Sequence, residues 1–209
     1  MLDLAYARAK AEDGLVAAGR WLESLGYAPA TSGNYSARLD GGAILVTMSG
    51  AHKGALGPGD FLVIEADGRA RDHGKKPSAE TPLHRMIYGL IQSAGVVLHT
   101  HSVNATVLSR HLDGSADLVL GGYEILKAFR GIETHQTTLR VPIFDNTQDM
   151  PALAERARAR LAHAATAPGF LIRGHGLYAW GVDMAEARRH VEAFEFLFAC
   201  ELERARLKA

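Results

Sequence analysis

The sequence is poor in several features that would direct a protein outside the cytoplasm. Cys200 is its only cysteine, so the chain cannot form an internal disulfide framework, which fits a reducing compartment. No apolar run approaches the roughly 20 residues that a membrane-spanning helix needs. The first residues carry charges where a signal peptide would have a continuous apolar stretch. We therefore expect a soluble, cytoplasmic protein.

The chain also lacks net charge. Lysine plus arginine and aspartate plus glutamate both number 23, and no basic run occurs. Without a field of one sign, neither nucleic acid nor an anionic membrane is expected as a partner. The 209 residues have 47% hydrophobic composition, enough to bury a substantial core. This length fits a single domain over residues 1–209 better than two domains.

Histidine is present in unusual number, with ten residues. Two of them end the apolar run Val96–His101, which is expected to form a buried strand. Side chains at positions i and i+2 of a strand point to the same face, so His99 and His101 converge. Paired imidazoles suit a divalent ion such as zinc, which often takes three protein ligands in a catalytic site. Two hydrogen-bonded strand histidines are the alternative. His175, between two glycines in a predicted tight turn, is the natural third ligand.

Two loops rich in small polar residues could bind an anion. The stretch 30–38 (ATSGNYSAR) is expected to be a loop that follows an amphipathic first helix ending near Gly26. The stretch 49–54 (SGAHKG) follows a strand expected over 43–48. Backbone amides freed by glycines, together with hydroxyls and Lys53, form the kind of nest that binds a phosphate dianion. A plain turn is the alternative for each loop.

A helix is expected within 75–91, because the apolar residues from Leu83 to Ile91 recur at helical spacing. Ser78 is the expected N-cap, which puts Glu80 in the first turn, where the helix dipole favours a negative charge. A surface carboxylate that complements the dipole is therefore one interpretation of Glu80. His84 lies beside the apolar stripe and is expected to be structural.

The remaining chain is expected to contain both strands and helices. Glu124 follows a pair of glycines and begins a short helical turn. Strands are expected over 61–65, over 134–144, and on both sides of the turn at His175. Helices are expected over 103–110, from about 150 to 163, and from Asp183 to near the end of the chain.

Taken in order, several motifs resemble the class II aldolase/adducin-type family over nearly the whole chain. They are the TSGN loop, the SG loop, the PSAE segment, the HTH pair and the GHG turn. The resemblance implies an α/β protein with a three-layer α/β/α fold, in which a central, largely antiparallel sheet lies between helices. It also implies a homotetramer and one zinc ion per subunit, bound by His99, His101 and His175.

The same resemblance implies that the substrate is a small phosphorylated sugar. The residues expected to contact its phosphate are Ser32, Gly33, Asn34, Ser49, Gly50 and Ser78, with Lys53 as a nearby cation. Three stretches, SGAHKGAL, GYEILKAFRGI and VPIFDNTQDM, are similar to family members that dehydrate 5-methylthioribulose 1-phosphate in methionine salvage. The implied activity is therefore that of a zinc-dependent hydro-lyase, with Glu124 as the essential acid/base.

Two other activities within the family remain open at this point. Aldolases and epimerases that act on fuculose 1-phosphate or ribulose 5-phosphate keep a carboxylate at the position of Glu80. Adducin-type binding modules lack the metal histidines. Because this chain has both Glu80 and Glu124, the sequence leaves the division of catalytic labour between them open.

Overall fold

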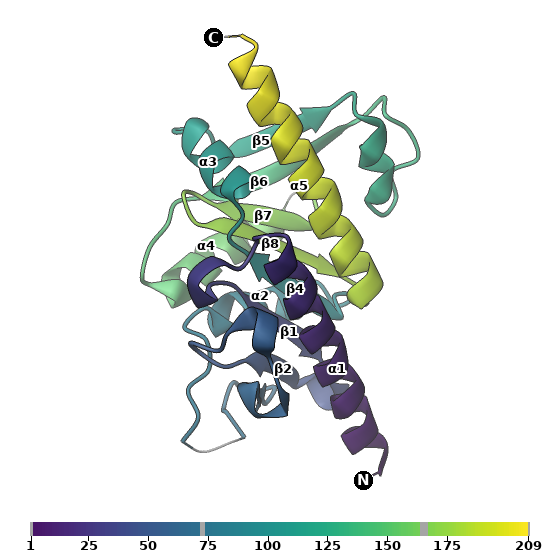
Figure 1. Ribbon diagram of the computed structural model, residues 1–209, viewed down its shortest axis with the longest axis vertical. Coiled ribbons are helices and arrows are strands. Elements are labelled where there is room, and N and C mark those ends of the chain that lie inside the picture. The colour runs from purple at the N-terminus through teal and green to yellow at the C-terminus, as the bar shows by residue number, and fades with distance from the viewer. Residues whose placement is uncertain (1, 72–73, 164–166, 209) are drawn as a thin grey trace.

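The computed structural model describes residues 2–71, 74–163 and 167–208, and it is built around an eight-stranded sheet in the order β3-β2-β1-β4-β8-β7-β6-β5 (Figure 1). Neighbouring described strands are antiparallel except β6 and β7, which are parallel. The strands are β1 (Asn34–Arg38), β2 (Ile44–Thr47), β3 (Phe61–Ile64), β4 (Val96–Thr100), β5 (Asp117–Gly121), β6 (Thr138–Phe144), β7 (Gly169–Ile172) and β8 (Gly176–Gly181).

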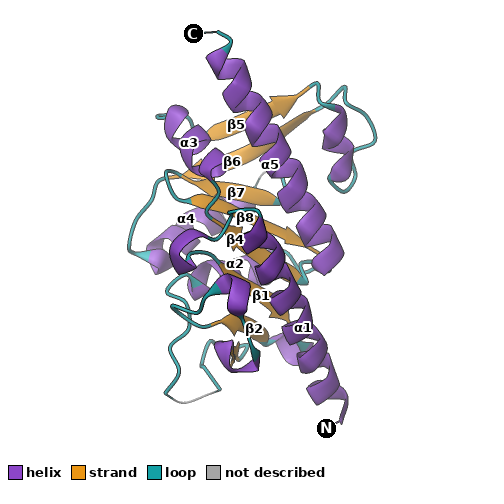
Figure 2. Ribbon diagram, in the orientation of Figure 1, coloured by secondary structure: helices purple, strands orange, loops and turns teal. Residues whose placement is uncertain are grey.

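Helices cover both faces of the sheet (Figure 2). One face carries α1 (Leu2–Ser24), α3 (Val103–His111) and α5 (Met184–Arg206), and the other carries α2 (Thr81–Leu90) and α4 (Met150–Leu161). Short 3-10 helices lie in the connections: η1 (Pro29–Thr31), η2 (Asp40–Gly42), η3 (Lys53–Ala55), η4 (Pro58–Asp60) and η5 (Glu124–Ala128). This arrangement confirms the predicted α/β/α fold with a largely antiparallel sheet.

Alternating side chains of the central strands enter two separate hydrophobic clusters. On β4, Val96 and Leu98 pack toward α1, α3 and α5, whereas Val97 packs toward α2 and α4. A sheet covered on both faces explains why every residue of β4 is buried. His99 therefore points to the α2 side of the sheet, and His101 follows it there just past the strand end.

Two local predictions were wrong, and one strand was missed. The stretch 34–38 is not loop but β1, a central strand between β2 and β4, and it went unrecognised because its polar residues Asn34 and Ser36 are buried. The edge strand β5 was also missed. The helix after Ser78 begins at Thr81 instead, because Pro82 has no N–H to donate to the Ser78 carbonyl and so prevents a first turn capped by Ser78.

Within the described ranges, no helix has both the length and the apolar character needed to cross a membrane.

Candidate active site

Three histidines from distant parts of the chain meet at one end of the central strands β4, β7 and β8. His99 lies in β4, His101 follows it, and His175 lies in the turn between β7 and β8. Their Nε2 atoms are 2.9 Å (99 to 101), 3.1 Å (101 to 175) and 3.4 Å (99 to 175) apart. Three nitrogens that bind one zinc ion tetrahedrally at about 2.0–2.1 Å lie about 3.3 Å from one another, so the spacing fits a shared metal.

The backbone around the histidines sets their orientation. His99 Nδ1 lies 2.9 Å from the carbonyl oxygen of Leu177, to which it donates, so Nε2 is the nitrogen left for a metal. Gly176 allows β8 to approach β4, because a Cβ there would lie 2.0 Å from the Thr100 carbonyl oxygen. The second glycine of the GHG turn is thus explained by the close approach of two strands.

Helix α3 holds the turn that carries His175. The Thr106 hydroxyl donates to the His175 carbonyl at 3.2 Å, and the Gly174 amide donates to the Ser109 hydroxyl at 3.0 Å. Arg173 donates to the carbonyls of Ser109 and Leu112 at the C-terminal end of the same helix. Because α3 begins two residues after His101, the second and third histidines share one support.

Glu80 faces the three histidines and is not a surface carboxylate. Its Oε2 lies 3.1 Å from His99 Nε2 and its Oε1 lies 3.1 Å from His175 Nε2, with 13% of the side chain exposed. Asn34 Nδ2 and the Tyr178 hydroxyl donate to Oε2 at 2.8 and 2.6 Å. Glu80 occupies the N-cap position of α2, which explains why its side chain leaves the helix axis toward the sheet.

The protonation states suit a metal site. Burial lowers the pKa of His99 to about 4 and that of His101 to about 3, so both imidazoles are neutral near pH 7, the form that binds metals. Burial raises the pKa of Glu80, but His99 and hydrogen bonds from His175, Asn34 and Tyr178 outweigh it and bring that pKa well below its ordinary value. The site therefore combines neutral imidazoles with an ionised carboxylate.

A cavity of about 500 Å³ opens onto these groups. Sequence reasoning missed several of its polar residues as functional candidates. Asn146 and Gln148 come from the connection between β6 and α4, and Thr106 comes from α3. Asn146 and Gln148 belong to the VPIFDNTQDM stretch, which was singled out only as a pattern.

Tyr178 was also missed, although it contacts the site most closely. Its ring stacks on His99 with centroids 4.0 Å apart, and its hydroxyl donates to Glu80. The alternation of β8 could have indicated it, since Tyr178 pairs directly with His99 across the two strands.

The loops expected to bind phosphate are joined to one another beside this cavity. Lys53 Nζ donates to the carbonyls of Thr31 and Ala51 at 2.9 and 2.6 Å, which links the loop of Ser32 and Gly33 to the loop of Ser49 and Gly50. Ser49 in turn donates its amide to Lys76, just before Ser78. Burial lowers the pKa of Lys53, while Asp60 and Glu80 oppose that shift.

Gly33 allows the loop of Ser32 and Gly33 to pack closely against β4, the strand that carries His99. Its φ is +78°, and a Cβ there would lie 2.7 Å from the His99 carbonyl oxygen. The Ser32 hydroxyl beside it is buried with no hydrogen-bond partner among the described residues. Asn34 differs from its neighbours, because both polar atoms of its amide are already used inside the protein, by Glu80 and by His84.

Glu124 is not brought to the histidines within one chain. β6 ends at Phe144, at the same end of the strands as His175. β5 is antiparallel to β6 and therefore ends at the opposite end of the strands, where Gly121 pairs with Thr138. The seven residues of β6 span about 20 Å. Glu124 follows β5 at that far end, where its side chain is 69% exposed and contacts Lys127 and His135.

The donor set fits a metal ion by its own chemistry. Three imidazole nitrogens converge, one of them on a ring fixed by a backbone carbonyl, and the buried His175 Nδ1 has no partner among the described residues. A shared metal ion would accept a lone pair from each of the three nitrogens. The cluster of His99, His101 and His175 is therefore a candidate metal centre.

Comparison with known proteins agrees with this geometry. Residues 13–202 match the model of the family described as Class II Aldolase and Adducin N-terminal domain. The chain is 55% identical over 200 residues to methylthioribulose-1-phosphate dehydratase of Marinobacter nauticus, covering 96% of each protein. It is 51% identical over 209 residues to the enzyme of that name from Hahella chejuensis, covering 100% of both.

A solved structure shares the architecture. L-fuculose-1-phosphate aldolase from Thermus thermophilus superposes with a TM-score of 0.75 at 25% identity, covering 96% of both chains. The family match covers most of the sequence, and the fold agrees with it. The chain belongs to the class II aldolase and adducin family.

Proposed function

We propose that this protein is a zinc-dependent hydro-lyase that dehydrates 5-methylthioribulose 1-phosphate to 2,3-diketo-5-methylthiopentyl 1-phosphate in methionine salvage. The main support is that similarity to two methylthioribulose-1-phosphate dehydratases over almost the whole chain coincides with three convergent histidines and a facing carboxylate. The site supplies groups that such a reaction needs, and the similarity favours dehydration over the other reactions of the family.

The reaction breaks a C–H bond at carbon 3 and the C–O bond at carbon 4, and water leaves. The resulting enol tautomerises to the diketone. When bound at the histidines, the ion supplies positive charge that polarises the ketone at carbon 2 and so acidifies the proton at carbon 3. The protein must also supply a base for that proton and an acid for the departing hydroxyl.

Glu80 is proposed to orient the substrate, and Glu124 to carry the proton. Glu80 is held in place by hydrogen bonds from Asn34 and Tyr178, and its two oxygens lie 3.1 Å from His99 and from His175. A fixed carboxylate can accept a hydrogen bond from a substrate hydroxyl and hold carbon 3 in place. Glu124, restrained only by exposed partners, is proposed to take the proton from carbon 3 and return it to the hydroxyl at carbon 4.

Glu124 lies at the end of the strands opposite the three histidines. The proposal therefore requires that the Glu124 of each active site come from a neighbouring copy of the chain. The surface around it favours such a contact: Ile125 and Phe196 are 37% and 56% exposed. They line an apolar hollow of about 650 Å³ together with Tyr123 and Glu124. A homotetramer would cover this surface and complete each site.

The phosphate of the substrate is proposed to bind in the joined loops of Ser32, Gly33, Ser49, Gly50 and Ser78. Two of the three donors of the Lys53 ammonium hold backbone carbonyls, which leaves one for a phosphate oxygen. Asn34 belongs to the same loop but serves Glu80 through its side chain. Binding at the phosphate, which takes no part in the bond changes, would hold carbon 3 near the base.

The test is incubation of the zinc-loaded protein with 5-methylthioribulose 1-phosphate, with fuculose 1-phosphate and ribulose 5-phosphate in parallel. We expect loss of water from the first substrate only. Mass spectrometry measures the product, and His175→Ala is the inactive control. A retro-aldol fragment from fuculose 1-phosphate, or an isobaric epimer of ribulose 5-phosphate, would identify an aldolase or an epimerase instead. Absence of both metal and turnover would favour a binding module.

A further inference from the structure

A buried series of hydrogen bonds runs from Glu80, at the N-cap of α2, to Tyr88 in the last turn of the same helix. Asn34 Nδ2 donates to Glu80, and Asn34 Oδ1 lies 2.5 Å from His84 Nε2. His84 Nδ1 lies 2.6 Å from the Ser36 hydroxyl, which lies 2.9 Å from the hydroxyl of Tyr88. His84 is fully buried and touches none of the three metal-site histidines through these bonds.

The donors and acceptors along this chain determine one direction. A carboxylate only accepts, so the Asn34 nitrogen must face Glu80 and its carbonyl must face His84. His84 therefore carries its proton on Nε2 and accepts at Nδ1, which requires the Ser36 hydroxyl to donate to it. Ser36 then accepts from Tyr88. The tautomer of His84 is thus set from the Glu80 side through Asn34, and the Ser36 hydroxyl supplies the matching donor at Nδ1.

We propose that His84 is the positioning residue of the active-site carboxylate: by donating from Nε2 it fixes the Asn34 amide, which in turn holds Glu80 against the histidines. The proposal deepens the proposed function and rests on it for its kinetic part. The positioning chain comprises Glu80, Asn34, His84 and Ser36, and Tyr88 lies outside it.

The effect of losing His84 follows from the two anchors of the Asn34 amide. Its oxygen is held by His84 and its nitrogen by Glu80. Without a donor at the oxygen, a buried acceptor is left unpaired and the amide is held at one end only. The Asn34 side chain can then shift and let Glu80 move off its position, with Tyr178 as the remaining fixed donor at Oε2.

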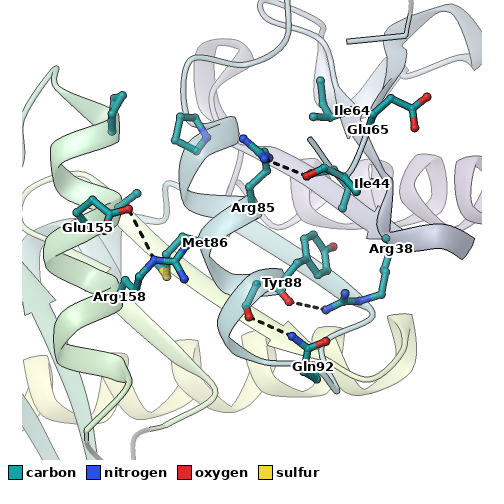
Figure 3. A pocket seen from close by; sticks show the side chains of 16 residues that line it. Arg38, Ile44, Ile64, Glu65, Arg85, Met86, Tyr88, Gln92, Glu155 and Arg158 are labelled. Atoms are coloured by element: carbon teal, nitrogen blue, oxygen red, sulfur yellow. Dashed lines mark hydrogen bonds and ion pairs between the residues drawn. The ribbon is translucent and has the colours of Figure 1, made fainter. Parts of the chain in front are cut away.

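Tyr88, which lies next to the positioning chain, is held in place independently of the active site. Tyr88 lines a separate cavity of about 460 Å³ between α2 and α4, in which Arg38 donates to the Tyr88 carbonyl at 2.8 Å (Figure 3). The Arg38 guanidinium also lies over the Tyr88 ring, 4.9 Å from its centroid. Since these contacts hold Tyr88 without its hydroxyl, removing that hydroxyl leaves the donation from Ser36 to His84 intact.

Two single-hydroxyl variants form a matched pair that tests the proposal. Ser36→Ala and Tyr88→Phe each delete one buried hydroxyl, but only Ser36→Ala removes the hydrogen bond that holds His84 at Nδ1. We expect Ser36→Ala to lower kcat severalfold with zinc content unchanged, and Tyr88→Phe to turn over like the parent. Equal kcat losses in both variants would show that the network is merely structural and would overturn the proposal.

Substitution of His84 itself gives a second arm. His84→Leu removes the donor and is expected to lower kcat about tenfold, in the range typical of residues that support metal-site ligands, with zinc content and KM nearly unchanged. His84→Gln places an amide N–H close to the position of Nε2 and is expected to recover most of the loss. If His84→Gln were as impaired as His84→Leu, the donated hydrogen bond would not be the cause.

A third readout needs neither substrate nor variant. In the zinc-loaded parent labelled with ¹⁵N histidine, we expect His84 to show a protonated Nε2 and an unprotonated Nδ1. The opposite tautomer would overturn the proposal even if every variant failed to fold. If the tautomer is as expected but the parent does not dehydrate 5-methylthioribulose 1-phosphate, the proposed function fails while the positioning of Glu80 stands.

Discussion

At the scale of single residues, the three histidines differ in what surrounds them but contribute equally to the candidate metal centre. His99 is fully buried, whereas His101 and His175 are partly exposed to the cavity. All three direct Nε2 at one point. Each is therefore expected to be required, whatever its exposure.

His99→Ala, His101→Ala and His175→Ala should each remove zinc and turnover together, because two imidazoles bind zinc much more weakly than three. Metal analysis of the purified variants measures the first effect, and the dehydration assay measures the second. The exposed His163→Ala is the control and should keep both. Full zinc occupancy in His175→Ala would mean that the third ligand lies elsewhere, with His84 and His135 as the next candidates.

His84 should also make the protein sensitive to acid. Burial lowers its pKa in the folded protein to about 4, against about 6.5 in the unfolded chain, so unfolding takes up a proton between those values. The free energy of unfolding should therefore fall as the pH falls from about 6.5, by up to about 1.4 kcal/mol per pH unit for this one group. Above pH 6.5 the group contributes no pH dependence.

Urea unfolding of the metal-free protein between pH 7.5 and 5 measures this slope. His84→Gln should unfold with a shallower pH dependence than the parent over the same range. The Glu80 carboxyl does not interfere, since its lowered pKa affects stability only below the ordinary pKa of about 4.5. Parallel slopes in parent and variant would show that His84 is not kept neutral by the fold.

Residue identities were easier to predict from the sequence than residue partners. The i, i+2 spacing of His99 and His101 was enough to predict their convergence, because a strand has a fixed period. The role of Glu80 was ambiguous, because the residues that hydrogen-bond its side chain inside the protein are far from it in the sequence. Asn34 and Tyr178, 46 and 98 residues from it, have no local pattern that pairs them with Glu80.

At the scale of elements, the loops between α1 and β3 are held by one buried cation. Lys53 begins η3, and its ammonium donates to carbonyls of η1 and of the loop after β2. Lys53→Met should therefore raise the KM for the sugar phosphate while leaving zinc content unchanged, because both a charge and the relative placement of two loops are lost. Steady-state kinetics and metal analysis separate these effects.

The exposed Lys75→Met makes the same chemical change on the surface of a neighbouring segment and should leave KM as in the parent. An unchanged KM in Lys53→Met would reduce this lysine to a structural tie between loops. The anion would then need a different cation.

Element types were predicted well where apolar periodicity was strong and poorly where polar residues are buried. Helices α3, α4 and α5 begin within one residue of their predicted starts, and Ser102, Asp149 and Asp183 each accept a hydrogen bond from a backbone amide of the first turn. β1 was missed because Asn34 and Ser36 occupy buried strand positions for hydrogen bonding, which a hydrophobic pattern does not reveal.

At the scale of the whole molecule, Glu80 and Glu124 lie at opposite ends of the strands of one sheet. Glu124→Gln should keep zinc and bind substrate but lose at least ~10²-fold in turnover, because the isosteric amide cannot transfer a proton. Glu80→Gln should lose less. Single-turnover dehydration at equal zinc occupancy compares them, and the reverse order would assign proton transfer to Glu80.

Co-expression of two differently tagged inactive chains tests whether sites are shared between copies. Assemblies of Glu124→Gln with His175→Ala should recover about a quarter of parental turnover, since random assembly unites an intact triad with a neighbour's intact Glu124 at that frequency. His99→Ala mixed with His175→Ala should recover none, because both defects lie in the same triad. Absence of recovery in the first mixture, with mixed assemblies isolated, would place Glu124 outside the reaction.

The frame that supports the histidines has a consequence for how the ion enters and leaves. Small zinc domains collapse without their metal, because its binding energy is their folding energy. Here the candidate ligands lie on or beside β4 and on a turn held by α3, between two large hydrophobic clusters whose members do not include the three histidines. A bound metal should therefore exchange without unfolding of the protein. A chelator should empty the site while the fold persists, and zinc or cobalt should then bind again without refolding. A site already shaped for three imidazoles does not select among such ions by folding, so the supply of metal in the cell sets which one it carries.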